Sequence, residues 1–160
     1  MLEMRVILPR DISEQLTDAL RKAGQQEIGG ILMGEHLSGQ TFKISEITIQ
    51  RNRGTFASFE RLFSGFSSAL KGFFRKTSYD FTRFNYLGEW HSHPSFDVIP
   101  SARDSATMRE IVSDPTVGAN FVVLMIVRLY DTKMRGTVTT YLPNGEYFRA
   151  RLIQDIERND

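Results

Sequence analysis

Residues 84–104 read FNYLGEWHSHPSFDVIPSARD, and this stretch carries most of the information about the fold. Its aromatic and aliphatic beginning predicts a strand that continues to Trp90 and leads into two histidines, His91 and His93. Pro94 follows directly, and because proline has no backbone N–H it predicts the end of the strand. The histidine pair is therefore expected at the mouth or edge of a sheet.

The end of the same stretch predicts a helix over residues 101–113. Ser101 is the expected N-cap, since a serine side chain accepts hydrogen bonds from the N–H groups of a first helical turn. Met108 and Ile111 have the spacing of a buried helical face. Asp104 lies one turn after Ser101, so the two side chains are expected to face a common point.

His91, His93 and Asp104 are candidate ligands of one metal ion. Side chains two residues apart on an extended segment point to the same face, so both histidines can reach one ion. Two histidines and a carboxylate supply three ligands of a tetrahedral zinc ion whose fourth position stays open for water, as in catalytic sites. A His-x-His pair alone is common in cores and at surfaces, and Ser-x-x-Asp alone is a common cap. Their combination at a strand end and a helix start favours one Zn²⁺ per chain.

The other periodicities predict a mixed sheet with about three helices, in a single α/β (α+β) domain over residues 1–160. The stretch EIGGILMG at residues 27–34 predicts a strand whose backbone another part of the molecule approaches closely. Further strands are expected at residues 5–8, 41–50, 119–130, 136–142 and 146–152, and further helices at residues 11–23 and 58–76. The last two strands are expected to form a hairpin about residues 143–145.

The composition is that of a soluble globular protein, with 41% hydrophobic and 24% charged residues. The formal net charge of +1 argues against nucleic acid or an anionic membrane surface as a partner. Cysteine is absent, which excludes disulfides, cysteine-based zinc sites and thiol nucleophiles. The N-terminus lacks a signal-peptide pattern, and the longest apolar run, residues 121–127, is too short to span a bilayer. We therefore expect a cytoplasmic protein.

The motifs together resemble those of the JAMM (JAB/MPN-type) zinc metalloproteases. Residues 91–104 match the signature of His-x-His, seven residues and Ser-x-x-Asp, and residues 27–34 match the upstream Glu-x-x-Gly-x-Leu-x-Gly strand. The resemblance covers roughly residues 4–130 in element order, and Gly-Glu-Trp-His at residues 88–91 is similar to the small bacterial members. Such bacterial proteins are often encoded beside ubiquitin-activating-like and conjugating-like enzymes, some of them in antiphage defence operons.

The resemblance implies a curved sheet flanked by helices, the JAB/MPN-type (cytidine-deaminase-like) fold. It implies a zinc ion bound by His91, His93 and Asp104, with Glu27 as the general base and Ser101 stabilising the oxyanion. The implied reaction is hydrolysis of an isopeptide or peptide bond after the C-terminal glycine of ubiquitin or a ubiquitin-like protein. Activating and conjugating enzymes of the same pathway are the other implied partners.

Glu89 is an alternative to Glu27 as the general base. On an extended strand it shares the parity of His91 and His93, so it also is expected to point towards the metal. The spacing does not separate the two glutamates, and only the resemblance favours Glu27. In that case Glu89 is a partner of a ligand histidine or a solvated strand residue.

Phenylalanine is concentrated in residues 55–84, which hold eight of the twelve in the chain. Phe59, Phe63 and Phe66 lie at helical spacing, so the simplest interpretation is a helix that packs on the sheet. The alternative is that Phe63 and Phe73 belong to an apolar groove for a ubiquitin-like partner.

Two further functions share the expected fold. One is a non-catalytic MPN-type scaffold that binds partners without metal, which the presence of all five signature residues argues against. The other is a hydrolase that processes sulfur-carrier-like proteins or small peptides with the same site. The sequence does not separate this second function from deconjugation.

Overall fold

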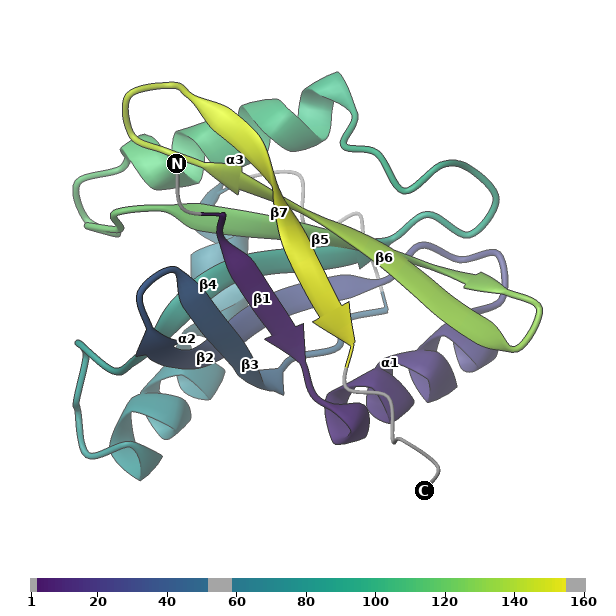
Figure 1. Cartoon of the computed structure of the whole chain (residues 1–160), viewed down its shortest axis with the longest axis horizontal. Coiled ribbons are helices and arrows are strands. Elements are labelled where there is room, and N and C mark those ends of the chain that lie inside the picture. The colour runs from purple at the N-terminus through teal and green to yellow at the C-terminus, as the bar shows by residue number, and fades with distance from the viewer. Residues whose placement is uncertain (1–2, 52–58, 155–160) are drawn as a thin grey trace.

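The computed structural model describes residues 3–51 and 59–154, with the backbone alone for residues 59–67. Figure 1 shows the strands and helices of this part of the chain. The strands are β1 (Arg5–Leu8), β2 (Gly29–Ser38), β3 (Thr41–Ile47), β4 (Phe84–Ser92), β5 (Val122–Tyr130), β6 (Lys133–Tyr141) and β7 (Tyr147–Gln154). The helices are α1 (Arg10–Ala23), α2 (Phe59–Lys76) and α3 (Ala102–Ser113).

The strands form one mixed sheet in the order β1-β3-β2-β4-β5-β6-β7, and this sheet closes on itself. It closes because β1 pairs in parallel with both β3 and β7. β4 and β5 are also parallel, so the chain must cross between them, and α3 lies in that crossover. The expected mixed sheet with three helices is confirmed, and the curvature proves strong enough to bring the two ends together.

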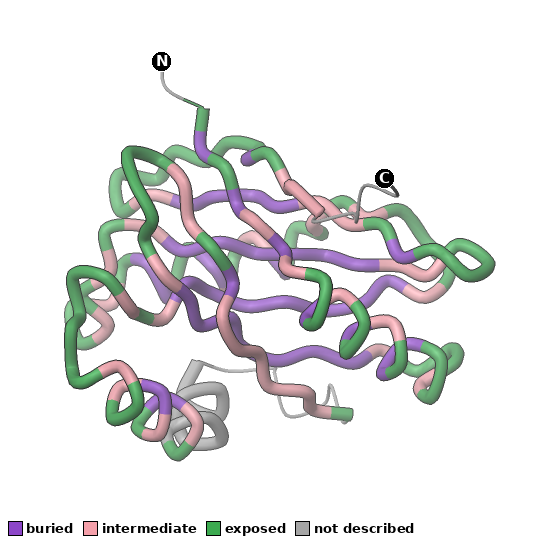
Figure 2. The backbone as a smooth tube through the Cα atoms, turned by 60° about the horizontal axis from the view of Figure 1, so that its bottom comes forward, coloured by how far each residue is buried: buried purple, intermediate pink, exposed green. Residues whose placement is uncertain are grey.

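The apolar side chains form two cores on the two faces of the sheet. One core lies inside the closed sheet and includes the buried face of α1, with Leu16 and Trp90 among its members. The other lies outside it, between β2, β4 and β5 and the helices α2 and α3. In Figure 2 the buried stretches follow the central strands, whereas the connecting loops are exposed. No helix in the described ranges is both long enough and apolar enough to cross a membrane.

Four predicted strands need correction at their ends. The strand expected at residues 119–130 begins at Val122, and the one expected at residues 41–50 ends at Ile47. The final hairpin consists of residues 133–141 and 147–154, so its first strand starts earlier and its second ends later than the periodicity indicated. Strand ends depend on the cross-strand partners available, which local alternation does not contain.

The phenylalanine-rich segment packs on the sheet where its side chains are described. Phe73 is 3% exposed and belongs to the outer core, with its ring edge-on to that of Phe84 at 6.2 Å. Phe74 and Phe81 instead line a hollow of about 750 Å³ beside residues 85–87, at the end of β4 remote from the histidines. The side chains of Phe56, Phe59, Phe63 and Phe66 lie outside the described residues.

Gly88 is the position where the strand geometry depends most directly on glycine. Its φ is +150°, and an added Cβ would lie 1.9 Å from the carbonyl oxygen of Val123 on the neighbouring strand. The contact is with backbone, so a side chain here forces β4 and β5 apart. Gly30 and Gly34 are similarly crowded, which confirms the close approach predicted for residues 27–34.

Replacing Gly88 by alanine is expected to lower the free energy of unfolding by more than about 2 kcal/mol, because overpacking and positive-φ strain add. Gly72 is the matched control, since it lies inside α2 with no atom within 4 Å of an added Cβ. Gly72→Ala is expected to raise the free energy of unfolding by about 0.5–1 kcal/mol. Urea denaturation of both variants measures the difference, and equal midpoints for the two would contradict the expectation.

Candidate active site

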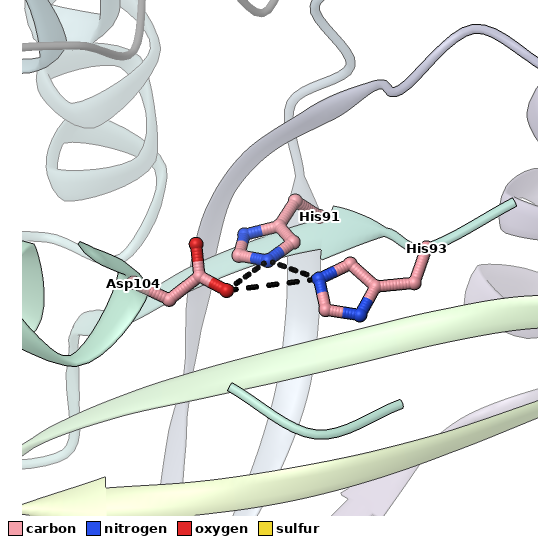
Figure 3. A group of neighbouring side chains, drawn as sticks. All are labelled: His91, His93 and Asp104. Carbon is pink, nitrogen blue, oxygen red and sulfur yellow. Dashed lines mark hydrogen bonds and ion pairs between the residues drawn. The ribbon is translucent and has the colours of Figure 1, made fainter. Parts of the chain in front are cut away.

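The three candidate metal ligands converge between the end of β4 and the start of α3 (Figure 3). His91 lies in β4, His93 follows it immediately after the strand, and Asp104 lies in the first turn of α3. Asp104 Oδ2 is 3.3 Å from His91 Nε2 and 3.6 Å from His93 Nε2, and the two Nε2 atoms are 3.2 Å apart. All three residues are buried, with exposed fractions of 8%, 1% and 6%. The structure thus brings together the three residues that the sequence nominated.

The donor atoms of this group fit a bound metal ion. One ligand atom from each residue lies within 4.8 Å of the other two. His93 Nδ1 is 2.6 Å from the carbonyl oxygen of Asp97. A carbonyl only accepts hydrogen bonds, so Nδ1 carries the proton and Nε2 presents its lone pair towards His91 and Asp104. His91, His93 and Asp104 can therefore hold a metal ion, and no other such group occurs among the residues that the structure describes.

His91 and the N-terminus of α3 together favour the ionised form of Asp104. The backbone N–H of Ser101 donates to Asp104 Oδ2 at 2.8 Å, and the N–H of Asp104 donates to Ser101 Oγ at 3.1 Å. Burial raises the pKa of Asp104, but the hydrogen bond and charge of His91 and the bonds from Ser101 outweigh it, leaving this pKa well below its usual range. The hydrogen bonds of the predicted N-cap therefore also fix the carboxylate of the candidate ligand Asp104.

The loop after the histidines is fixed beside the site. The ring of Phe96 stacks on that of His93 with centroids 4.0 Å apart, and Asp97 supplies the carbonyl already described. Thr137 on β6 donates its hydroxyl hydrogen to the carbonyl oxygen of Val98. Phe96 and Ile99 remain 44% and 58% exposed, so the loop presents apolar side chains to solvent next to the candidate metal ligands.

Glu27 lies just before β2, where the pairing of β2 with β4 brings it close to the histidines. Gly29 pairs with His91, and Ile28 and Ser92 exchange two hydrogen bonds of 2.9 and 3.0 Å. This register, continued by one residue, places Glu27 opposite His93. Opposite residues of an antiparallel pair project to the same face, so the half-buried Glu27 lies on the face of the ligands.

Two residues that contribute to this arrangement were not identified from the sequence. Ser92 is fully buried, and its Oγ accepts the N–H of Ile28, so its side chain attaches the segment carrying Glu27 to β4. Gly29 leaves room for the facing strand, because an added Cβ would lie 2.6 Å from the carbonyl oxygen of Trp90 and 3.0 Å from the Cβ of His91. The sequence did contain a signal for Ser92. It is a small polar residue between two candidate ligands, at a strand position that faces the opposite side from them.

Glu89 also projects to the ligand face, as its parity predicted. It is 7% exposed and pairs with Ile31 and Leu124, both members of the outer core. A register shift near Leu87 brings Tyr86 to the same face, and burial followed by the charge of Glu89 raises the pKa of Tyr86. Glu89 therefore lies deeper along the strand than the histidines, in apolar surroundings and near Tyr86.

Ser101 is exposed and forms the N-cap of α3. Its Oγ uses one lone pair for the N–H of Asp104, which leaves the hydroxyl hydrogen available as a donor. The hydroxyl thus lies one turn from the candidate ligand Asp104 with its donor capacity retained.

Comparison with known proteins assigns this arrangement to one family. Residues 9–140 match the family described as prokaryotic homologs of the JAB domain, and all five signature residues fall in this range. A relative from Enterobacter hormaechei subsp. hoffmannii, named CD-NTase/cGAS isopeptidase, is 27% identical over 112 residues. The matched part is 68% of this chain and 59% of that relative, so the chain aligns with about three fifths of the relative's length.

A solved structure supports the fold independently. The solution structure of a protein from Desulfitobacterium hafniense matches 96% of this chain and 95% of its own with a TM-score of 0.68. The two sequences are 20% identical, so the likeness concerns the fold.

Proposed function

Because the chain belongs to the family of prokaryotic homologs of the JAB domain, we propose that it is a zinc-dependent isopeptidase. The proposed substrates are conjugates or precursors of a ubiquitin-like protein, cut after the C-terminal glycine of that protein. The observation that carries the proposal is the buried group His91, His93 and Asp104, with Glu27 directly before Ile28, which is hydrogen-bonded to Ser92 between the two histidines. The isopeptidase name of the Enterobacter relative favours a conjugate over other amide substrates.

His91, His93 and Asp104 are the proposed zinc ligands. When bound there, zinc supplies Lewis acidity, which lowers the pKa of water towards about 7 and polarises the scissile carbonyl. The hydrogen bond between His93 Nδ1 and the Asp97 carbonyl orients one ligand, and the capping bonds of Ser101 orient Asp104. The protein thereby holds the donor set in place before substrate arrives.

Glu27 is the proposed proton carrier. Its carboxylate takes a proton from the attacking water and delivers it to the amine that leaves the scissile bond. Glu27 suits this exchange because it is half-buried at the mouth of the sheet, whereas Glu89 lies within the outer core.

Ser101 is proposed to donate its hydroxyl hydrogen to the oxygen of the scissile carbonyl as negative charge develops there. Ser101→Ala is expected to lower kcat by about 10²-fold and the free energy of unfolding by about 1 kcal/mol, because it removes both the donor and the cap. Ser101→Thr keeps both groups and is expected to retain most of the activity. Steady-state kinetics with urea denaturation separate the two effects, and full activity of the alanine variant would rule out the oxyanion role.

The proposed reaction is tested by incubating zinc-loaded protein with a ubiquitin-like domain fused through its C-terminal glycine to a reporter. Cleavage after that glycine is expected, with loss of activity on chelation and recovery when zinc is restored. Mass spectrometry of the products identifies the bond that is cut. Cleavage that survives chelation would refute the zinc dependence. A protein that neither binds metal nor cleaves the fusion would refute the proposal in favour of a non-catalytic scaffold.

A further inference from the structure

The sheet places arginines directly opposite one another at two positions. Arg5 of β1 pairs with Arg151 of β7, and Arg128 of β5 pairs with Arg135 of β6. Like charges directly opposite across strands destabilise a sheet. The guanidinium groups of Arg128 and Arg135 share the ring of Tyr130, at 4.6 and 5.9 Å, which offsets the repulsion of that pair. No comparable contact occurs for Arg5 and Arg151 within the described ranges.

Arg5 and Arg151 belong to a wider basic surface on β1, β6 and β7. These three strands contain no aspartate or glutamate. Their basic residues are all exposed and are Arg5, Lys133, Arg135, Arg149 and Arg151, which we call the basic sheet face. Among the described residues, none of the five forms an ion pair. The charge is therefore segregated in a chain that has 20 basic and 19 acidic residues overall.

The basic sheet face lies on the outside of the closed sheet. Lys133 and Arg135, at one margin of this face, line a hollow together with residues of α1. Val6 and Ala150 point into the inner core, so their strand neighbours Arg5, Arg149 and Arg151 point outward. Figure 1 shows β1 and β7 towards the viewer, with α2 and α3 behind the sheet. The half-buried Ile7 and Ile153 pair with each other next to Arg5 and Arg151, so the face combines guanidinium groups with apolar area.

We propose that the basic sheet face binds an acidic surface segment of a partner protein. Arginine guanidinium groups form bidentate contacts with carboxylates, and arginine and tyrosine next to aliphatic side chains are typical of protein interfaces. A net charge of only +1 lacks the long-range attraction that nucleic-acid binding relies on, which favours a protein partner. Carboxylates on the partner also relieve the repulsion between Arg5 and Arg151.

The position of this face leaves the proposed active site open. In the ring of strands β4 is separated from β1 by two strands on one side and by three on the other. The proposed metal ligands lie at the end of β4 beside α3. In the closed sheet this position is across from β1 and β7. A partner on the basic sheet face thus anchors the protein without covering His91, His93 and Asp104.

Arg151→Glu provides the test, because it changes both binding and stability in a defined direction. The probe is a fluorescein-labelled peptide of about ten glutamates, measured by anisotropy at low salt, where surface electrostatics are screened least. We expect Arg151→Glu to weaken binding at least about tenfold. The same substitution places opposite charges across β1 and β7, so we expect the melting temperature to rise by about 1–3 °C. A rise in melting temperature excludes unfolding as the cause of lost binding.

Lys71→Glu is the matched control, since it makes the same charge change at an exposed position of α2. It is expected to bind the peptide as the unmodified protein does, and Arg5→Glu is expected to reproduce the loss from the other side of the pair. Equal weakening by Lys71→Glu, or no binding of the peptide to the unmodified protein, would overturn the proposal. Tighter binding of a 20-nucleotide oligothymidylate, abolished by Arg151→Glu, would overturn it in favour of nucleic acid.

Discussion

Replacing Glu27 by glutamine is expected to lower the turnover of a ubiquitin-like fusion by about 10²- to 10⁴-fold, the usual contribution of a general base. Glutamine has nearly the same shape but cannot accept the proton of the attacking water. Glu27 is not among the proposed zinc ligands, so the variant is expected to bind one zinc ion per chain as before. Single-turnover kinetics and metal analysis of the same sample measure the two quantities.

Glu89→Gln is the matched control for this prediction. Glu89 projects to the same face of β4 as His91, but it is enclosed by the outer core and lies near Tyr86. We expect its substitution to change turnover less than about tenfold, as befits a residue without a direct role in proton transfer. If Glu89→Gln abolishes turnover and Glu27→Gln retains it, the two assignments must be exchanged.

Replacing Asp104 by asparagine is expected to abolish cleavage and to weaken zinc binding by more than about 100-fold. This loss of zinc affinity exceeds the range typical for residues that only hydrogen-bond to a metal ligand. Asp104 is the anionic member of the donor set, and its pKa is held well below the usual range. Asparagine retains an oxygen that can accept the N–H of Ser101, so the cap of α3 persists while the charge is lost. Zinc affinity by competition with a chromophoric chelator provides the measurement.

Asp114→Asn controls for the loss of a negative charge on α3. Asp114 forms the C-cap at the other end of the helix, where its side chain accepts hydrogen bonds from Thr116. This variant is expected to keep both zinc binding and cleavage. Equal zinc affinity of the Asp104 and Asp114 variants would remove Asp104 from the donor set.

Much of the site was predictable because its determinants are local. Pro94 ends β4 close to His93, and Ser101 and Asp104 form both hydrogen bonds of a capping box within four residues. Alternation along β4 places His91 and its neighbour Glu89 on one face. Each of these features depends on backbone chemistry or side-chain spacing that acts over a few residues.

The choice between Glu27 and Glu89 was not predictable from spacing. Both project to the ligand face, and their difference lies in what surrounds them. The contacts that fix the segment of Glu27 join Ile28 to Ser92, residues 64 apart in the sequence. The register shift near Leu87 further decides which residues of β4 accompany Glu89. Pairing at this separation is set by the whole sheet, so alternation within one strand cannot reveal it.

By itself, then, the sequence identified the three residues that converge as candidate ligands, the cap that positions Asp104 and the class of fold, because these follow from short-range periodicity and the chemistry of few residues. The tertiary structure alone decided that the sheet closes through β1, that Ile28 next to Glu27 is hydrogen-bonded to Ser92, and that Arg5 faces Arg151. Each of these depends on the register between strands distant in the chain. That register is selected by the burial of both faces of the sheet and by glycines such as Gly88 that let two backbones approach.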